Sequence, residues 1–251
     1  MLQGQGRDWS EAWNWPRIAV RSGGNSLLWR AKDPRGGKSV AIKWNRVSGE
    51  SDKYNRNVAN VEEEVLRACR HPNLVELYDA RDELGRRLLM LEWLDGKNLD
   101  QISKWDLPLQ RAVKIVRATG HALSEIHDHG FVHGDISPAN VMCVSGPSDV
   151  KVIDLAFRNL DGRSCSRFYA SGGTMGFKAP EKEEKNVRII DRRVDVYSMG
   201  RLLRFLTEGI VSSAHDQYRP LISTVIDRAC AFDPSHRYKD MPTMLAALPS
   251  V

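Results

Sequence analysis

The chain contains the stretch His133-Gly134-Asp135-Ile136-Ser137-Pro138-Ala139-Asn140, followed by Val152-Ile153-Asp154. This stretch supplies a carboxylate at Asp135, an amide five residues later at Asn140, and a second carboxylate at Asp154. Phosphoryl transfer from a nucleotide uses such a set, because one carboxylate takes the proton of the attacking hydroxyl while the amide and the other carboxylate hold magnesium. The pattern therefore predicts Asp135 as a catalytic base and Asn140 and Asp154 as metal ligands.

The composition is that of a globular protein. The chain has 251 residues, of which 41% are hydrophobic and 27% are charged, enough to form one or two compact lobes. No run approaches the roughly 18 apolar residues of a membrane span, and the N-terminus lacks the layout of a secretion signal. Four well separated cysteines without a C-x-x-C pair argue against disulfides and structural zinc, so we expect a cytoplasmic location.

The formal net charge is +5, and basic residues crowd the stretch that follows Asp154. They are Arg158, Arg163, Arg167, Lys178, Lys182, Lys185, Arg188, Arg192 and Arg193. One interpretation is an ordinary solvated surface, since charge runs are usually exposed. The other is a basic rim that attracts ATP or acidic protein substrates. Neither interpretation predicts a nucleic-acid or membrane partner.

Local patterns predict an α+β fold in two parts. Turn residues and short apolar runs predict strands at 18–20, 27–29, 39–44, 74–78 and 88–94. Apolar residues at helical spacing predict helices at 59–70, 109–128, 194–206 and 221–232. A β-rich part followed by an α-rich part indicates two lobes. Trp9, Trp13 and Trp15 are expected to pack on the outside of the smaller lobe.

Lys43 ends the run Val40-Ala41-Ile42-Lys43 on a predicted strand, where an ammonium needs an anionic partner. Glu62 is the expected partner, because it shares a helical face with Leu66 and Cys69 while Glu63 and Glu64 turn away.

With this run upstream and Ala179-Pro180-Glu181 downstream, the chain resembles the catalytic domain of Hanks-type serine/threonine protein kinases, in a compact bacterial or phage-like form. The resemblance runs from about residue 18 to 248. It implies one bilobal kinase domain over 1–251, with an antiparallel sheet and one helix in an N-lobe at about 16–93, a hinge at 92–98 and a helical C-lobe at 99–248. It also implies that Lys43, held by Glu62, contacts the phosphates of ATP, with Mg²⁺ or Mn²⁺ as the metal.

The resemblance also assigns nucleotide contacts. Arg21, Gly23 and Ser26 occupy the three usual glycine positions of the phosphate loop, so only one glycine remains there, with Gly24 beside it. A simple hairpin turn is the alternative interpretation of this segment. The other implied contacts are Leu28, Ala41 and Met142 around the adenine, Leu91 as gatekeeper, the backbone of Glu92 and Leu94, and Asn98 near the ribose.

Three departures from the family pattern concern the chemistry. Gly134 replaces an arginine that usually awaits an activation-segment phosphate, and Ser137 replaces a lysine that usually touches the transferred phosphate. The usual Asp-Phe-Gly becomes Asp154-Leu155-Ala156, which is expected to restrict rearrangement of this segment.

The segment Gly173-Thr174-Met175-Gly176-Phe177-Lys178-Ala179-Pro180-Glu181, here called the ledge, bears on the substrate class. In the family it supports the protein substrate, and small-molecule kinases of the aminoglycoside and choline type lack it. The resemblance implies that Thr174 bonds near Asp135 and that Glu181 pairs with Arg237. It also implies that Asp195 braces the stretch 133–140 from a buried helix. Thr174 favours serine or threonine acceptors.

Three functions remain open at this point. The leading one is an active protein kinase that modifies protein substrates and itself, with Ser164 or Ser166 as the self-modified residue. A nucleotide-binding pseudokinase is the second, because of Arg21, Ser26, Ser137 and Ala156. A small-molecule kinase is the third, and the ledge argues against it.

Overall fold

The computed structural model describes residues 9–22, 26–45, 52–102, 107–144, 149–155, 159–160, 163–164, 173–182, 189–208 and 217–250. The chain divides into two compact units. The first unit comprises Met1–Arg67 and Val75–Leu94, and the second comprises Ala68–Leu74 and Asp95–Val251. The stretch 68–74, which the sequence places within the smaller lobe, therefore belongs to the second unit.

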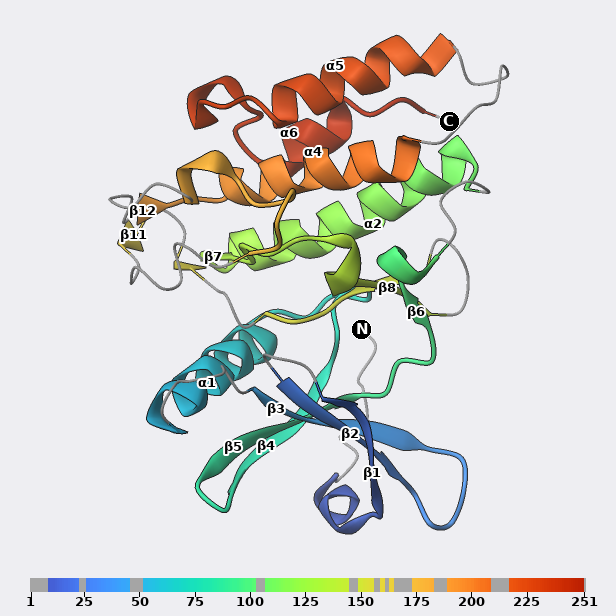
Figure 1. The fold of residues 1–251 in the computed structure, drawn as a ribbon, viewed down its shortest axis with the longest axis vertical. Coiled ribbons are helices and arrows are strands. Elements are labelled where there is room, and N and C mark those ends of the chain that lie inside the picture. Colours follow the sequence, from blue (N-terminus) through green and yellow to red (C-terminus); the bar gives the residue numbers. More distant parts are fainter. Residues whose placement is uncertain are drawn as a thin grey trace. The chain divides into compact units, whose positions relative to one another are not determined.

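The first unit is built on one antiparallel sheet with the strand order β1-β2-β3-β5-β4 (Figure 1). Its elements are η1 (Ser10–Asn14), β1 (Arg17–Ser22), β2 (Ser26–Lys32), β3 (Ser39–Asn45), α1 (Asp52–Ala68), β4 (Leu77–Glu83) and β5 (Arg86–Glu92). The predicted α+β class is confirmed, because the strands gather here and the long helices dominate the second unit.

Two elements of the first unit differ most from their predicted bounds. Helix α1 begins at Asp52, seven residues earlier than predicted, because its first turns carry polar residues that give no apolar period. The fourth strand is Leu77–Glu83 rather than 74–78. Leu74 belongs to the second unit and forms an isolated parallel bridge with Val152 of that same unit. The apolar residues at the start of 74–78 are buried near this bridge and are not part of a strand. Strand β4 itself is polar at most positions, so it provides no apolar signal.

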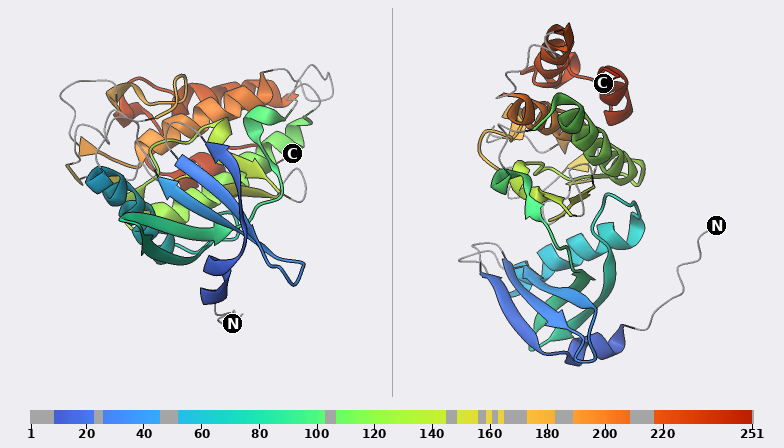
Figure 2. Two further views of the ribbon diagram at one scale, coloured as in Figure 1. Left: turned by 60° about the horizontal axis from the view of Figure 1, so that its bottom comes forward. Right: turned by 90° about the vertical axis from the view of Figure 1, so that its right-hand side faces the viewer.

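The N-terminal tryptophans belong to the core of the first unit. Trp13 and Trp15 are 5% and 7% exposed and pack in one cluster with residues of β2, β3 and β5. Trp13 Nε1 donates a hydrogen bond to Asp79 Oδ2 at 2.7 Å, and Trp9 stacks on Tyr78 with ring centroids 4.1 Å apart. Figure 2 shows η1 as the dark blue coil beside the strands. The expected location on the outside of the smaller lobe is therefore wrong for Trp13 and Trp15, whose rings complete the core of the first unit.

The second unit is mainly helical. Its longer elements are α2 (Leu109–Asp128), α4 (Arg193–Thr207), α5 (Arg219–Ala229) and α6 (Met241–Ala246). Its short helices are η2 (Leu99–Gln101), η4 (Pro138–Asn140), η5 (Pro180–Lys182) and η7 (Pro234–His236). Its short strands are β6 (Lys97–Asn98), β7 (Phe131–Val132), β8 (Val141–Cys143), β9 (Val150–Val152), β10 (Asn159–Leu160), β11 (Arg163–Ser164) and β12 (Ile189–Ile190).

Helices α2 and α4 lie side by side in the second unit, and α5 packs on α4 (Figures 1 and 2). A Cβ at Gly200 would lie 2.7 Å from Ala229 Cβ and 2.8 Å from Cys230 Sγ, so glycine permits this close approach. Helix α5 ends at Ala229, and Phe232, predicted to be helical, lies beyond it and is 74% exposed. Among the described helices, none has the length and apolar character needed to cross a bilayer.

Candidate active site

The backbone of the catalytic loop, His133–Asn140, is held by a buried carboxylate. Asp195, in the first turn of α4, is fully buried and accepts hydrogen bonds from two loop amides. The amide of His133 donates to Oδ2 at 2.9 Å, and that of Gly134 donates to Oδ1 at 2.8 Å. The predicted bracing of the loop by Asp195 is therefore present. These two charge-assisted hydrogen bonds compensate the buried carboxylate. They also fix the backbone of the loop at His133 and Gly134, immediately before Asp135.

His127, in the last turn of α2, is a further partner of this carboxylate that the sequence reasoning missed. Its Nε2 lies 2.8 Å from Asp195 Oδ2, and both side chains are buried. Burial opposes ionisation of Asp195, but the hydrogen bond with His127, the charges of the two histidines and the loop amides outweigh it, so the pKa of Asp195 is lowered. No local pattern marks His127, since its partner lies 68 residues away.

The predicted base, Asp135, is partly buried at the mouth of this loop and is fixed by the ledge. Thr174 donates to its Oδ1 from both the backbone amide and Oγ1, each at 2.7 Å. Burial raises the pKa of Asp135; hydrogen bonds from Thr174 and the charge of His133 oppose this effect, and the charge of Asp154 adds to it. Because both Thr174 bonds go to Oδ1, Oδ2 remains suited to accept a substrate proton.

Ser137, which replaces the family lysine, is fully buried. Thr174 Oγ1 lies 3.2 Å from Ser137 Oγ, so this hydroxyl belongs to the same polar cluster as Asp135. The serine therefore supports Thr174 and brings no positive charge toward a phosphate.

Asn140 and Asp154, the predicted metal ligands, lie close together in the second unit. Asn140 Nδ2 donates to the backbone oxygen of Asp135 at 2.8 Å, which leaves its amide oxygen as an acceptor. The backbone oxygen of Asn140 accepts from the amide of Ile153 at 3.0 Å, next to Asp154. Asp154 has φ of 66°, an uncommon conformation for a non-glycine residue and one often found at functional sites.

This donor set fits magnesium, which usually binds to one or two protein oxygens and completes its shell with water and substrate phosphates. Within the described ranges, no group of three or more His, Cys, Asp or Glu side chains is placed to hold a metal.

The first unit contains the predicted ion pair between β3 and α1. Lys43 Nζ lies 2.7 Å from Glu62 Oε1 and 2.9 Å from Oε2, and the two side chains are 8% and 0% exposed. Glu63 turns away from Lys43 as predicted and binds Arg87, while Glu64 is exposed. The spacing of the helix therefore identified the correct carboxylate.

The end of the ledge is anchored by the predicted pair of Glu181 and Arg237. Arg237 Nη1 and Nη2 each lie 2.7 Å from one Glu181 oxygen, a bidentate arrangement. Arg237 also donates to the backbone oxygens of Arg193, Ala231 and Phe232. Met175, in the middle of the ledge, is 93% exposed. The ledge is thus fixed at both ends and presents an apolar side chain between them.

The predicted nucleotide contacts are divided between the units. Ser26, Leu28, Ala41, Leu91, Glu92 and Leu94 belong to the first unit, and Asn98 and Met142 to the second. Asn98 is buried and donates to the backbone oxygen of Ala139 at 2.8 Å, so it also has a structural role in the second unit. Gly23, Gly24 and Ala156 lie outside the described residues, and the side chain of Arg21 is likewise not described.

Comparison with known proteins identifies the family. A family model described as the protein kinase domain matches residues 20–242. The chain belongs to the protein kinase family. It is 30% identical to serine/threonine-protein kinase PknB of Mycobacterium leprae over 261 residues, covering 90% of this chain and 41% of that protein. Serine/threonine-protein kinase pkn3 of Myxococcus xanthus is 30% identical over 210 residues, covering 78% of this chain and 38% of that protein. The chain thus spans about two fifths of the length of these relatives.

One residue of the kinase domain contradicts its sequence interpretation. Lys182 follows the Ala-Pro-Glu end of the ledge and falls within the basic run, where either a solvated face or a basic rim was expected. It is instead 2% exposed, and its Nζ donates to the backbone oxygen of Gly134. A lysine beside other charged residues gives no sequence signal for burial. Arg158, Arg167, Lys185 and Arg188 lie outside the described residues, and the side chain of Arg163 is not described.

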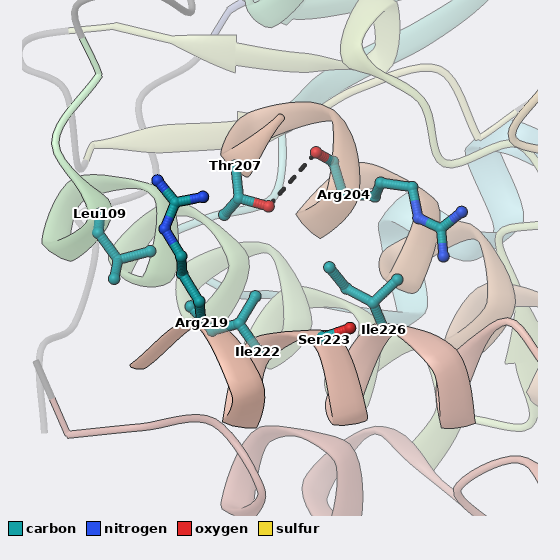
Figure 3. A pocket seen from close by; sticks show the side chains of 7 residues that line it. All are labelled: Leu109, Arg204, Thr207, Arg219, Ile222, Ser223 and Ile226. Atoms are coloured by element: carbon teal, nitrogen blue, oxygen red, sulfur yellow. Dashed lines mark hydrogen bonds between the residues drawn. The ribbon is translucent and has the colours of Figure 1, made fainter. Parts of the chain in front are cut away.

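The kinase domain also has a cavity away from the catalytic loop, of about 330 Å³ (Figure 3). It is lined from α2, α4 and α5 by Leu109, Arg204, Thr207, Arg219, Ile222, Ser223 and Ile226. Among the residues that the structure describes, its lining includes no carboxylate and no residue of the catalytic loop or the ledge.

Proposed function

We propose that this chain transfers the γ-phosphoryl group of ATP to serine or threonine hydroxyls of protein substrates. The observation that carries the proposal is the doubly held Asp135, whose Oδ1 accepts two hydrogen bonds from Thr174 of the ledge. The same residue that orients the base thus belongs to the segment that supports a protein substrate in this family. The names of the relatives, serine/threonine-protein kinases, support the same activity.

In the proposed reaction, Asp135 Oδ2 accepts the proton of the substrate hydroxyl. The hydroxyl oxygen attacks the γ-phosphorus, the bond to the β-phosphate oxygen breaks, and ADP leaves with that electron pair. The raised pKa of Asp135 makes its carboxylate a better proton acceptor than an exposed aspartate. Thr174 and the backbone contacts of the loop keep this oxygen directed toward the acceptor.

Each unit contains some of the residues predicted to contact the nucleotide. Lys43, oriented by Glu62, would contact the phosphates, and Leu28, Ala41, Met142, Leu91, Glu92, Leu94 and Asn98 would contact the adenosine. Asn140 and Asp154 would hold Mg²⁺, or Mn²⁺ in its place, and the metal when bound would neutralise charge on the transferred group. Among the described residues of this set, Lys43 is the positively charged side chain that we assign to the phosphates.

A pseudokinase is the second function, favoured by one observation. Ser137 is buried against Thr174 where the family usually has a phosphate-contacting lysine, so one positive charge is missing from the transition state. Against it, Lys43, Glu62, Asp135, Asn140 and Asp154 are all present, and phosphoryl transfer depends mostly on positioning and charge.

Substrate class is tested by incubating the chain with γ-labelled ATP, Mg²⁺ or Mn²⁺, and separate acceptors. The acceptors are a basic protein, an acidic protein, an aminoglycoside and choline. The proposal predicts label on protein, recovered as phosphoserine or phosphothreonine after acid hydrolysis. Label only on the small molecules would overturn it. Absence of label from every acceptor, with nucleotide binding retained, would establish the pseudokinase instead.

Self-modification is the accompanying prediction. If the chain phosphorylates itself, Ser164 or Ser166 takes the phosphate, because both follow Asp154 in the segment that precedes the ledge. The backbone of Ser164 lies in β11, while Ser166 lies outside the described residues. Mass spectrometry of protein incubated with ATP would locate the phosphate. Phosphate found only elsewhere would contradict the assignment.

A further inference from the structure

Lys182 is a buried cation at the junction of the ledge and the catalytic loop. It is the last residue of η5 and one of the largest fully buried side chains among the described residues. Its Nζ donates to the backbone oxygen of Gly134, 48 residues earlier in the chain. Burying an ammonium costs free energy unless it is paired and hydrogen-bonded. The hydrogen bond to the loop offsets part of this cost for a residue type that usually lies at the surface.

Gly134 is held from both sides by buried charges. Its amide donates to Asp195 of α4 at 2.8 Å, and its oxygen accepts from Lys182 of η5. Its φ is 76°, a left-handed conformation that glycine adopts without strain. The glycine thus fits the shape of the backbone here, while the anion and the cation fix both of its polar groups.

The oxygen of Gly134 belongs to the peptide bond that joins Gly134 to Asp135. A planar peptide bond moves as a unit, so fixing this oxygen restricts the orientation of the Asp135 backbone. Thr174 then fixes the Asp135 carboxylate from the side-chain end. The base is accordingly constrained at its backbone by Lys182 and at its carboxylate by Thr174.

We propose that Lys182 is a positioning residue, which couples the ledge to the catalytic loop through the Gly134 oxygen and so sets the orientation of Asp135. The proposal rests on the proposed phosphoryl transfer. The neighbouring Glu181 binds Arg237. At the end of the ledge, Glu181 thus contacts Arg237, and the next residue, Lys182, contacts the catalytic loop. Gly134 stands where the family usually has an arginine, so this position of the loop carries no positive charge. Lys182 of η5 supplies a positive charge to the loop instead.

The test compares Lys182→Met and Lys182→Arg with the matched control Lys151→Met. Lys151 is a partly buried lysine of β9 whose Nζ also donates to a backbone oxygen, that of Leu74 at 3.3 Å. We expect Lys182→Met to lower kcat for protein phosphorylation by about 10- to 100-fold, as small displacements of reacting groups do. The KM for ATP, nucleotide affinity and binding stoichiometry should change by no more than about twofold.

Lys182→Arg should recover kcat to within a few-fold of the wild type, because it keeps a cationic donor, and Lys151→Met should leave kcat unchanged. A merely structural role would instead lower the nucleotide-binding stoichiometry and leave kcat per binding-competent molecule intact. Wild-type kcat in folded Lys182→Met would overturn the proposal, as would equal losses in Lys182→Met and Lys151→Met.

A measurement on the wild type covers the case in which Lys182→Met does not fold. In ¹⁵N-lysine-labelled protein, the ammonium signal of Lys182, assigned from its loss in Lys182→Arg, should exchange with water far more slowly than those of exposed lysines. Exchange as fast as at exposed lysines would show that the contact is absent in solution and overturn the proposal. Because this signal does not depend on turnover, an inactive wild type with a slowly exchanging Lys182 would refute the proposed function alone.

Discussion

At the scale of single residues, buried charges in this chain are paired with partners of opposite charge or with backbone dipoles. Lys43 has Glu62, Asp195 has His127 and two loop amides, and Arg237 has Glu181. Such pairs add little net stability when intact but cost much when one partner is removed, because the other charge is left buried. Each pair also fixes a group that the proposed reaction needs in one orientation.

The prediction at this scale concerns Glu62→Gln. Removing the carboxylate charge leaves the buried Lys43 ammonium uncompensated, so we expect the free energy of unfolding to fall by about 3 kcal/mol. Nucleotide affinity should fall as well, because Lys43 is no longer held in place. Urea unfolding and ATP titration measure the two effects. The control is Glu64→Gln on the exposed face of the same helix, and equal behaviour of the two variants would contradict the account.

These residues also show what sequence can predict at this scale. Lys43 and Glu62 were recognisable because strand alternation and helical spacing give a side chain its direction. Asp135, Asn140, Asp154 and Thr174 stand at fixed separations within known motifs. Lys182 and His127 were missed because their partners are distant in the chain and no local period encodes a single long-range contact.

At the scale of elements, the N-terminal η1 is joined to the first unit by its tryptophans. Trp13 is buried among residues of the sheet and donates to Asp79. Arg17, four residues later, donates to the backbone oxygen of Trp13 and forms an ion pair with Glu83 at 2.9 Å. The aromatic residues at this end thus close one side of the core of the first unit. Stability of the sheet should therefore depend on a segment that precedes its first strand.

We predict that Trp13→Ala lowers the free energy of unfolding of the first unit by about 3 to 5 kcal/mol, the usual cost of deleting a large buried aromatic side chain. Trp13→Phe keeps most of the apolar volume and loses the hydrogen bond to Asp79, so it should cost about 1 to 2 kcal/mol. Urea unfolding followed by circular dichroism provides both values. Near-wild-type stability of Trp13→Ala would show that η1 is dispensable.

The helices and strands could be predicted where apolar residues recur with a regular period. Helix α2 begins and ends at the predicted residues 109 and 128, because one face is apolar throughout and Pro108 and Gly130 flank it. The early turns of α1 were missed because polar residues conceal the period, and β4 was misplaced by an apolar run that is buried without being a strand. Boundaries without an apolar period depend on tertiary contacts that the sequence does not display.

At the scale of the whole molecule, both units carry carboxylates whose pKa is lowered by folding. The hydrogen bond from Arg17 lowers the pKa of Glu83 in the first unit from 4.5 to about 2, with burial opposing and Arg81 assisting. In the second unit the pKa of Asp195 is lowered as described above. A lowered folded-state pKa contributes stability that is complete above the unfolded-state pKa and is lost as the pH falls through the folded-state pKa.

Stability should therefore fall as the pH decreases from about 4.5 to about 2. The specific prediction is that Glu83→Gln is less stable than the wild type at pH 7 and that the difference shrinks over this interval. Urea unfolding at several pH values measures it, with the exposed Glu76→Gln as the control. A difference that is independent of pH would contradict the assigned pairing of Glu83 with Arg17.

The central claim, that Asp135 is the base of a protein kinase reaction, is tested most directly by transfer from labelled ATP to protein in Asp135→Asn. The matched control is Asp128→Asn, an exposed aspartate at the end of α2. The account predicts that Asp135→Asn loses at least about 100-fold in rate at unchanged nucleotide affinity, while Asp128→Asn equals the wild type. Wild-type transfer by Asp135→Asn would contradict the account.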